Sequence, residues 1–543
     1  MSSRRFLLLA IIPLVCLAAC KEPEPRILSI FPRIGAVGDI LTIEGEHFGG
    51  EQRESYVTIG GISPTSPSYL EWRNESIILR IPEFNESGLV YVYVGRQKSN
   101  AALFTSHEAI PEPAAGEAAG VSPRISSVSP LAGSTGSLVT IQGSNFGSSR
   151  GESGVYFAWT ARASASAPAE VSGPGRVEVS GADLGYEFWS DREIRVRVPD
   201  GAQSGTLEVE TSRGKSSPQY FEVTGRPGTR TYRDKRSYSI SYSVDIQVRE
   251  ASTASNTLYL WVPTPVISGS QRKRELLSRE TGALVENYQG VSLYGLQGLG
   301  SGASQRISLA WLVDVYAVET AVVSSQIRSS AALSPLESAF TLATELIPSG
   351  DAAVRQQAAA IVGRETNKYL KAQRIYEWIR RETAIQTGPL EGGVLEALET
   401  KQADPYMAAL LFCALARASG LAAQPVAGVL IDQYPGTRSH YWAEFWIEGF
   451  GWIPVDPALG AGAAPPSFNL REDHGAWYFG SLDNQRIAFS RGETLFSRMD
   501  PRGRITARSR EYALQNLWEE AVGGLDSYSS LWSGIIINGV YAE

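Results

Sequence analysis

The sequence predicts a multidomain, mostly β chain in which two all-β sandwiches and a third β-rich region precede an α+β domain. Three observations predict this: a repeat near the N-terminus, alternating strand patterns over residues 230–330, and helical patterns followed by a hairpin within residues 335–490. With 543 residues, 43% of them hydrophobic, the chain can fill several cores. A net charge of −8, with no basic run after the leader, argues against a nucleic-acid partner.

Residues 1–19 have the pattern of a lipoprotein signal peptide. Arg4 and Arg5 form its charged start, and the apolar stretch 6–17 is too short for a usual membrane span. The stretch ends in Leu17-Ala18-Ala19-Cys20, which resembles a bacterial lipobox. That resemblance implies that Cys20 is acylated and anchors the mature chain in a membrane of the bacterial cell envelope, facing either the periplasm or the exterior. An ordinary secretory leader and an uncleaved anchor are the alternatives.

Residues 25–49 and 123–147 form an internal repeat at a constant spacing of 98 residues. The aligned pairs are Gly35/Gly133, Gly38/Gly136, Thr42/Thr140, Gly45/Gly143 and Phe48/Phe146. Each copy then continues to a second anchor, Trp72…Pro82 in the first and Trp189…Pro199 in the second, and the spacing from tryptophan to proline is the same in both. Short alternating strands with glycine turns predict two β-sandwiches. The pattern Pro-x-Ile-x-Ser-(Ile/Val)-x-Pro-x-x-Gly resembles IPT/TIG immunoglobulin-like domains, which implies spacer or interaction modules.

These two domains are predicted at residues 20–106 and 123–225, joined by an Ala/Pro/Glu-rich linker over 107–122. The second copy carries an insertion near residues 158–182, whose Ala/Ser/Pro-rich run from Ala163 to Ala169 predicts a mobile loop.

A third β-sandwich-like domain is predicted over residues 230–330. Strand patterns occur at 238–248, 257–265 and 307–316, and we expect this domain to pack against the α+β domain. A C-terminal extension, residues 491–543, follows the α+β domain, and a helix is predicted within it at about residues 508–521.

The stretch Ser439–Pro457 is the most informative for function. Alternating residues, two glycines and a second alternating run predict a strand, a tight turn and a second strand. Such a hairpin would hold His440 within side-chain reach of Asp456. A histidine oriented by a carboxylate is half of a thiol-type catalytic triad. It is equally a hydrogen-bonded pair that stabilises a hairpin.

The motifs His-x-Trp-x-Glu, Gly-x-Gly-Trp and Val-Asp-Pro in this stretch resemble the second and third catalytic motifs of the bacterial transglutaminase-like superfamily. Residues 367–378 resemble the helix before the family's nucleophile, and residues 415–428 resemble the end of the nucleophile helix and the next strand. The resemblance spans residues 335–490. It implies a papain-like fold with a Cys–His–Asp triad, in which His440 and Asp456 are the candidate catalytic residues.

The family's cysteine precedes the arginine of the Leu-x-Arg-Ala-x-Gly motif by twelve residues. That arginine is Arg417 here, so the nucleophile position is occupied by Pro405. Asp404 is a good N-cap and proline is favoured at the first helical position, so the helix is predicted to form without a thiol at its start. Gln424 stands where the family often has an arginine, which is a second departure.

Cys413 is the only internal thiol, because Cys16 lies in the leader and Cys20 is the predicted acylation site at its end. It lies eight residues beyond Pro405, about 12 Å further along the predicted helix. Its neighbours from 409 to 415 are apolar, which predicts a buried and unreactive thiol.

Four functions follow from these observations. The favoured one is a lipoprotein with a catalytically degenerate transglutaminase-like domain that binds a protein, a peptide or cell-wall material. The alternative is an active cysteine peptidase or amide transferase that uses Cys413, His440 and Asp456. A hydrolase whose His440 activates water as a general base is a third function, and a purely structural surface protein is a fourth. No cofactor and no metal are expected.

Overall fold

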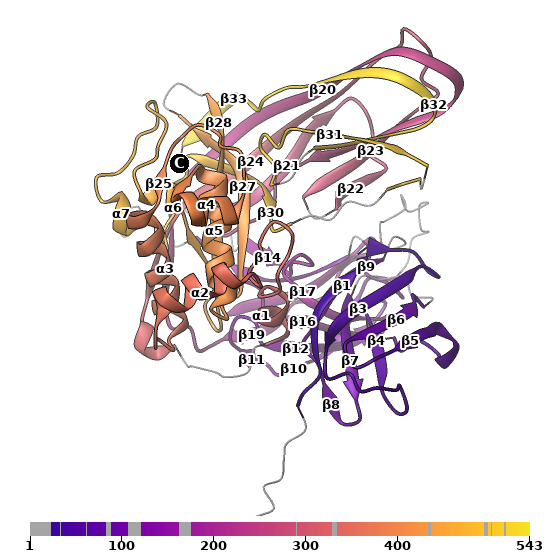
Figure 1. Ribbon diagram of the computed structural model, residues 1–543, viewed down its shortest axis with the longest axis vertical. Coiled ribbons are helices and arrows are strands. Elements are labelled where there is room, and N and C mark those ends of the chain that lie inside the picture. The colour runs from indigo at the N-terminus through magenta and orange to yellow at the C-terminus, as the bar shows by residue number, and fades with distance from the viewer. Residues whose placement is uncertain are drawn as a thin grey trace, which may run out of the picture.

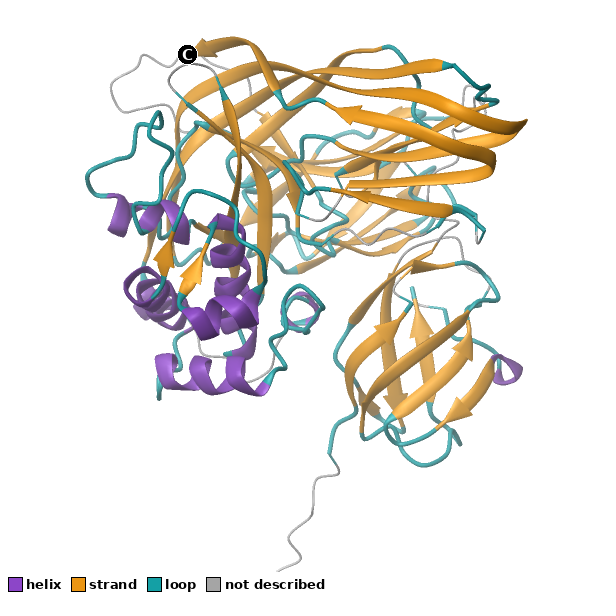
Figure 2. Ribbon diagram, turned by 45° about the horizontal axis from the view of Figure 1, so that its top comes forward, coloured by secondary structure: helices purple, strands orange, loops and turns teal. Residues whose placement is uncertain are grey.

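The computed structural model describes residues 23–542, with gaps at 33, 61, 83–87, 107–120, 152, 162–174, 289, 328–333, 433–435, 494–497, 501 and 515–516. Residues 1–22, which include the predicted acylation site Cys20, lie outside the described residues, as do most of the linker and the Ala163–Ala169 loop. The predicted fold class is confirmed: the chain is multidomain and mostly β, with helices gathered in one region (Figures 1 and 2). Among the helices described, none is long and apolar enough to cross a membrane.

The first sandwich consists of a sheet of order β1-β3-β6-β5 facing a sheet of order β2-β9-β7-β4, with β8 paired to β7. Between their inner faces lies an apolar core. The strands are β1 (Arg26–Phe31), β2 (Ile34–Gly35), β3 (Ile40–Glu46), β4 (Tyr56–Ile59), β5 (Tyr69–Trp72), β6 (Ser76–Arg80), β7 (Gly88–Val94), β8 (Gln97–Lys98) and β9 (Ala102–Ser106).

The second sandwich repeats this topology, with sheets of order β10-β12-β16-β15 and β11-β19-β17-β13. It adds β14, which lies in the predicted insertion and pairs with β13. The strands are β10 (Arg124–Ser129), β11 (Ala132–Gly133), β12 (Leu138–Ser144), β13 (Gly154–Trp159), β14 (Gly175–Glu178), β15 (Tyr186–Trp189), β16 (Glu193–Arg197), β17 (Gly205–Thr211), β18 (Gly214–Lys215) and β19 (Gln219–Val223).

The repeated residues have a common structural role in the two copies. A Cβ atom at Gly45 would collide with the backbone carbonyl of Arg26 and with the ring of Phe48. The repeated tryptophan then fixes this corner, because the indole Nε1 of Trp72 donates to the carbonyl of Phe48 at 2.9 Å. In the second copy, Gly143 is crowded in the same way and Trp189 donates to Phe146. The repeated glycine therefore occupies a tightly packed corner in each sandwich, where a larger residue would not fit.

The third β-rich region is built on one very long strand, β20 (Gly228–Pro263). It pairs with β24 along most of its length and also with β23, β32 and β33. The remaining strands are β21 (Gln271–Arg279), β22 (Val285–Tyr288), β23 (Val291–Gln297), β24 (Ser304–Val322), β31 (Arg504–Arg508), β32 (Leu517–Trp532) and β33 (Ile536–Ala542).

The prediction of a helix at about residues 508–521 is wrong. Residues 504–508 and 517–532 are the strands β31 and β32, which pair with each other, and β32 also pairs with β20. The backbone groups along the edge of β20 need hydrogen-bond partners, and this tertiary demand overrides the weak helical pattern. The C-terminal extension is therefore an integral part of the sheet that begins at residue 228.

The α+β region combines helices with a four-stranded antiparallel sheet of order β29-β28-β27-β30. These strands are β27 (Ala423–Ile431), β28 (Thr437–Ile447), β29 (Gly451–Val455) and β30 (Arg486–Arg491), and a separate pair is formed by β25 (Ala384–Ile385) and β26 (Gln402–Ala403). The helices are α1 (Pro335–Ala339), α2 (Ala352–Val362), α3 (Lys368–Glu382), α4 (Val394–Thr400), α5 (Pro405–Ala418), α6 (Pro457–Gly460) and α7 (His474–Trp477).

The second sandwich contacts the hairpin of this region directly. Gly449, in the turn between β28 and β29, donates its backbone N–H to the carbonyl of Thr135 at 3.2 Å. Arg230, at the start of β20, forms an ion pair with Asp200 of the second sandwich and also donates to the carbonyl of Trp452 in β29. Three segments far apart in the sequence therefore meet at the β28–β29 turn.

Gly45→Ala should destabilise the first sandwich by about 1–3 kcal/mol, the usual cost of inserting a methyl group where no space exists. Gly50→Ala is the matched control, because a Cβ at Gly50 meets nothing within 4 Å. Hydrogen exchange of β1 and β3 would measure both variants. Equal protection in the two would contradict the role assigned to Gly45.

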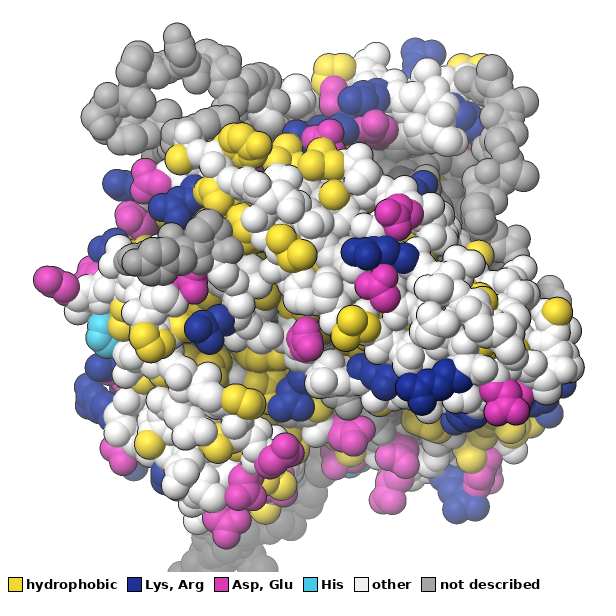
Figure 3. All heavy atoms as spheres, turned by 90° about the horizontal axis from the view of Figure 1, so that it is seen from above, with side chains coloured by type: hydrophobic (Ala, Val, Ile, Leu, Met, Phe, Trp, Pro, Cys, Tyr) yellow, Lys and Arg dark blue, Asp and Glu magenta, His cyan; other side chains and the backbone are white. Residues whose placement is uncertain are grey.

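The two C-terminal strands should differ in importance. Figure 3 looks onto the end of the molecule where Figure 1 draws β20, β32 and β33, and exposed hydrophobic side chains are visible there. Most of β33 is exposed, whereas β32 buries residues such as Ala521 and Leu525 in the core. Removal of residues 536–543 should lower the melting temperature only slightly, and removal of 517–543 should abolish cooperative unfolding. Equal melting curves for the two truncations would contradict this.

Candidate active site

The helix α5 begins as the sequence predicts. Asp404 is its N-cap and accepts a hydrogen bond from the backbone N–H of Met407 at 2.8 Å, while Pro405 is the first helical residue. The second carboxylate oxygen of Asp404 accepts from the backbone of Leu390 at 3.0 Å. With both oxygens bonded to the backbone, Asp404 fixes the start of the helix firmly. No thiol is present at this start.

α5 runs along β28, the strand that carries His440. The ring of Tyr406 meets that of Tyr441 with centroids 5.1 Å apart, and Phe412 meets Phe445 at 6.1 Å. The first turn of α5 therefore lies beside the strand position that follows His440. Successive side chains of a strand alternate, so His440 turns away from Tyr441 and toward the end of β29.

His440 and Asp456 form the hydrogen-bonded pair expected from the hairpin. The distance between Nε2 of His440 and Oδ2 of Asp456 is 2.8 Å. The antiparallel pairing of β28 with β29 places Asp456 just beyond the last residue of β29, diagonal to His440. His440 is 2% exposed and Asp456 is fully buried, so the pair is closed off from solvent.

Asp456 has two further partners that no motif in the sequence indicates. Its Oδ2 accepts from Nη1 of Arg486 at 3.0 Å, and its Oδ1 caps α6 by accepting from the backbone of Leu459 at 3.0 Å. Burial opposes ionisation, but His440 and Arg486 outweigh it and hold the pKa of Asp456 below its ordinary value. The carboxylate thus serves as counter-ion and helix cap at once.

Arg486 is itself almost fully buried. Its Nη2 forms an ion pair with Asp483 at 2.6 Å, and its guanidinium lies over the ring of Trp442 at 4.9 Å from the centroid. In the sequence, Arg486 stands directly before the apolar residues of a strand. A charged residue in that place is the one feature of the sequence that could have indicated a buried ion pair.

A second buried charge cluster lies further along the same hairpin. Glu444 of β28 pairs with Nε of Arg491 at 2.7 Å, and Nη1 of Arg491 reaches Asp183 of the second sandwich at 2.6 Å. Gln424 lies opposite Glu444 in the pairing of β27 with β28. The positive charge absent at position 424 is therefore supplied from β30 by Arg491.

Cys413 lies inside the core around α5, as predicted. It is fully buried, and burial raises the pKa of its thiol to about 12. A thiol with that pKa is protonated at neutral pH and is a poor nucleophile. The structure therefore does not bring Cys413 together with His440 and Asp456 as a working triad.

A C-terminal segment lies over the first turn of α5. The hydroxyl of Tyr441 donates to the backbone carbonyls of Arg510 and Glu511 at 2.8 and 3.0 Å. The guanidinium of Arg510 lies over the ring of Tyr406 at 3.9 Å from the centroid. This contact was not predicted, because the segment carries no motif and lies about 100 residues away in the sequence. Within the ranges that the structure describes, no three His, Cys, Asp or Glu side chains gather in a way that could hold a metal ion.

Asp456→Asn should destabilise the fold by about 3–5 kcal/mol at neutral pH, because it leaves Arg486 buried with one counter-ion fewer. The lowered pKa of Asp456 means that its contribution is present above about pH 4 and is lost as the pH falls through the folded-state value. Urea unfolding across this range would show a loss of stability on acidification that is smaller in the variant.

Asp473→Asn is the matched control, because Asp473 forms an exposed pair with Arg471. That substitution should change the free energy of unfolding by less than about 1 kcal/mol. If both variants lowered the free energy of unfolding by similar amounts, the buried Asp456 would contribute no more to stability than an exposed ion pair does.

Comparison with known proteins identifies the domains that carry this geometry. The profile of the transglutaminase-like superfamily matches residues 355–457, and the IPT/TIG domain profile matches residues 25–107 and 123–223. An uncharacterized protein of Haemophilus influenzae is 30% identical over 135 residues, which cover 20% of this chain and 36% of the relative. The chain thus spans about a third of the length of that relative.

Among solved structures, a proposed cysteine protease from Cytophaga hutchinsonii is 14% identical, with a TM-score of 0.36, over 58% of this chain and 93% of that one. The periplasmic domain of TgpA from Pseudomonas aeruginosa is also 14% identical, with a TM-score of 0.25, over 44% of this chain and 92% of that one. By its family profiles, the chain contains two IPT/TIG domains followed by a domain of the transglutaminase-like superfamily.

Proposed function

We propose that this chain is a membrane-tethered lipoprotein of the bacterial cell envelope whose transglutaminase-like domain is catalytically degenerate and acts in protein or cell-envelope binding. The observation that carries the proposal is Pro405 at the first position of α5, where the family's cysteine would stand. The N-terminus of a helix lowers the pKa of a thiol placed there. Proline has no group that could use this effect.

The only internal thiol does not replace the missing one. Cys413 lies within the apolar core of α5, and its pKa is raised to about 12, which is the opposite of what a nucleophile needs. The alternative of a cysteine peptidase or amide transferase that uses Cys413 would require α5 to leave the sheet against which it packs.

The retained pair His440–Asp456 has a structural use that does not depend on catalysis. Asp456 neutralises Arg486, accepts from His440 and caps α6, all inside the protein. Removing one partner from such a cluster is costly even when no reaction occurs. Retention of both residues is therefore compatible with a domain that only binds.

The arrangement of domains supports a role in display and recognition. The second sandwich is joined to the hairpin through Asp183 and Arg491, and the first sandwich lies nearer in sequence to the predicted anchor at Cys20. With Cys20 acylated, the sandwiches would act as spacers between the membrane and the transglutaminase-like domain.

Thiol chemistry tests the loss of catalysis. In a soluble chain that starts at residue 21, Cys413 is the only thiol. It should resist alkylation by iodoacetamide near pH 8 in the native protein and react after unfolding. Rapid native alkylation that is lost in His440→Ala would establish the cysteine-enzyme alternative instead.

Pro405→Cys tests the position of the lost nucleophile. The new thiol should react faster than an ordinary thiol and titrate below about 8.5, the value for a free cysteine. Ser419→Cys, at the opposite end of the same helix, is the matched control and should titrate at or above that value. Equal pKa values for the two thiols would show that position 405 is not the nucleophile position.

A further inference from the structure

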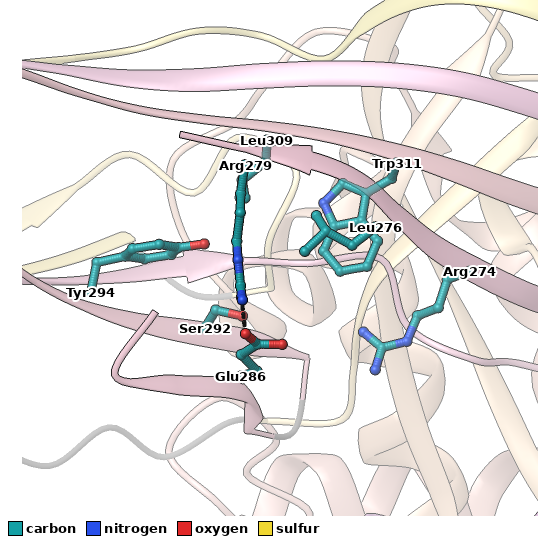
Figure 4. Close-up of a pocket in the computed structure, with 8 residues that line it drawn as sticks. All are labelled: Arg274, Leu276, Arg279, Glu286, Ser292, Tyr294, Leu309 and Trp311. Atoms are coloured by element: carbon teal, nitrogen blue, oxygen red, sulfur yellow. Dashed lines mark ion pairs between the residues drawn. The ribbon is translucent and has the colours of Figure 1, made fainter. Parts of the chain in front are cut away.

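The sheet built on β20 contains a cavity that lies outside the transglutaminase-like domain. Its volume is about 170 Å³, and its walls come from β21, β22, β23 and β24 (Figure 4). The lining residues are Arg274, Leu276, Arg279, Glu286, Ser292, Tyr294, Leu309 and Trp311. None of them belongs to α5 or to the β28–β29 hairpin, so ligand binding in this cavity would be independent of the role assigned to Pro405.

The lining carries more positive than negative charge. Arg279 of β21 and Glu286 of β22 form an ion pair at the wall of the cavity (Figure 4). Arg274, the second guanidinium, has no carboxylate within ion-pair distance among the described residues, and its Nη1 donates to the carbonyl of Pro265 at 2.9 Å. Burial lowers the pKa of Arg274, and Glu178 of β14 opposes this only at longer range. Arg274 thus has no carboxylate at ion-pair distance among the described residues, and its guanidinium lies over the ring of Trp311 at 5.7 Å from the centroid.

The rest of the wall combines aromatic rings with hydroxyl groups. Tyr294 is 2% exposed and Trp311 is 8% exposed, and both contact the apolar core behind them. Figure 4 shows the hydroxyl of Tyr294 directed toward Arg279, with Ser292 beside Glu286. Buried polar groups of this kind favour a ligand that carries several hydrogen-bonding groups.

We propose that this cavity binds one carboxylate-bearing sugar unit of the hexuronate class. The carboxylate would pair with Arg274, the hydroxyl groups would bond to Tyr294, Ser292 and the Arg279–Glu286 pair, and the apolar face of the ring would lie against Leu276, which lines the cavity and is only partly buried. A neutral sugar would leave Arg274 without a counter-charge. An amino acid would bring an ammonium group among two guanidinium groups, which is unfavourable.

Saturation-transfer NMR and calorimetry with the chain from residue 21 onward test the proposal, with glucuronate as the probe and glucose as the uncharged counterpart. Glucuronate should bind saturably and at least about tenfold more tightly than glucose, the difference expected of one charge-assisted hydrogen-bond pair. Arg274→Met should weaken glucuronate binding by about the same factor. Lys273→Met is the matched control, because Lys273 is the neighbouring residue of β21, is half exposed and pairs with Glu275.

Each outcome decides the proposal. Saturable binding of glucuronate that is lost in Arg274→Met and kept in Lys273→Met, with unchanged melting temperatures, establishes the site. Absence of saturable binding, or equal affinity for glucose, overturns it. Displacement of glucuronate by acetate at equal concentration also overturns it, because the cavity would then be a simple anion site with no recognition of the sugar ring.

Discussion

The transglutaminase-like domain is organised by the need to neutralise carboxylates that have no access to water. Glu444 and Asp456 project from the β28–β29 hairpin into the protein, and each requires a cation within hydrogen-bonding distance. Both cations come from β30, which begins with Arg486 and ends with Arg491. Because Arg491 also pairs with Asp183, the same requirement fixes the second sandwich against the hairpin. The position of three chain segments thus follows from two buried acids.

Because of these buried contacts, the residues of a catalytic motif can be kept for the stability of the fold alone. The His-x-Trp-x-Glu and Val-Asp-Pro motifs are present, and each of their polar residues has a packing partner that would keep it in place without a reaction. Pro405, at the start of α5, has no polar side chain that could make such a contact. Proline, with its fixed φ and missing N–H, supports the start of a helix at least as well as cysteine does. Proline at position 405 is therefore fully compatible with the fold of the helix.

The sequence contained enough information for the parts of the structure that local rules govern. The glycine-rich corner of the repeat, the cap at Asp404, the burial of Cys413 and the pairing of His440 with Asp456 each follow from spacing, capping or hydropathy. The partners Arg486 and Arg491, the strands in place of the C-terminal helix, and the contact of Arg510 with Tyr406 depend on segments that meet only in the folded chain. The cavity beside Arg274 also escaped prediction, because four separate strands build it.

The length of β20 has a consequence for how the protein reaches its folded state. Ser241 of β20 is bonded to Asn538 of the strand β33, 297 residues later in the sequence. Closing so large a loop is slow, and until β32 arrives the edge of β20 carries unpaired backbone groups. A chain synthesised from its N-terminus carries this edge unpaired for the whole time that the later residues emerge. Such an edge is a template for aggregation, so the folding chain is exposed to aggregation until β32 pairs with it.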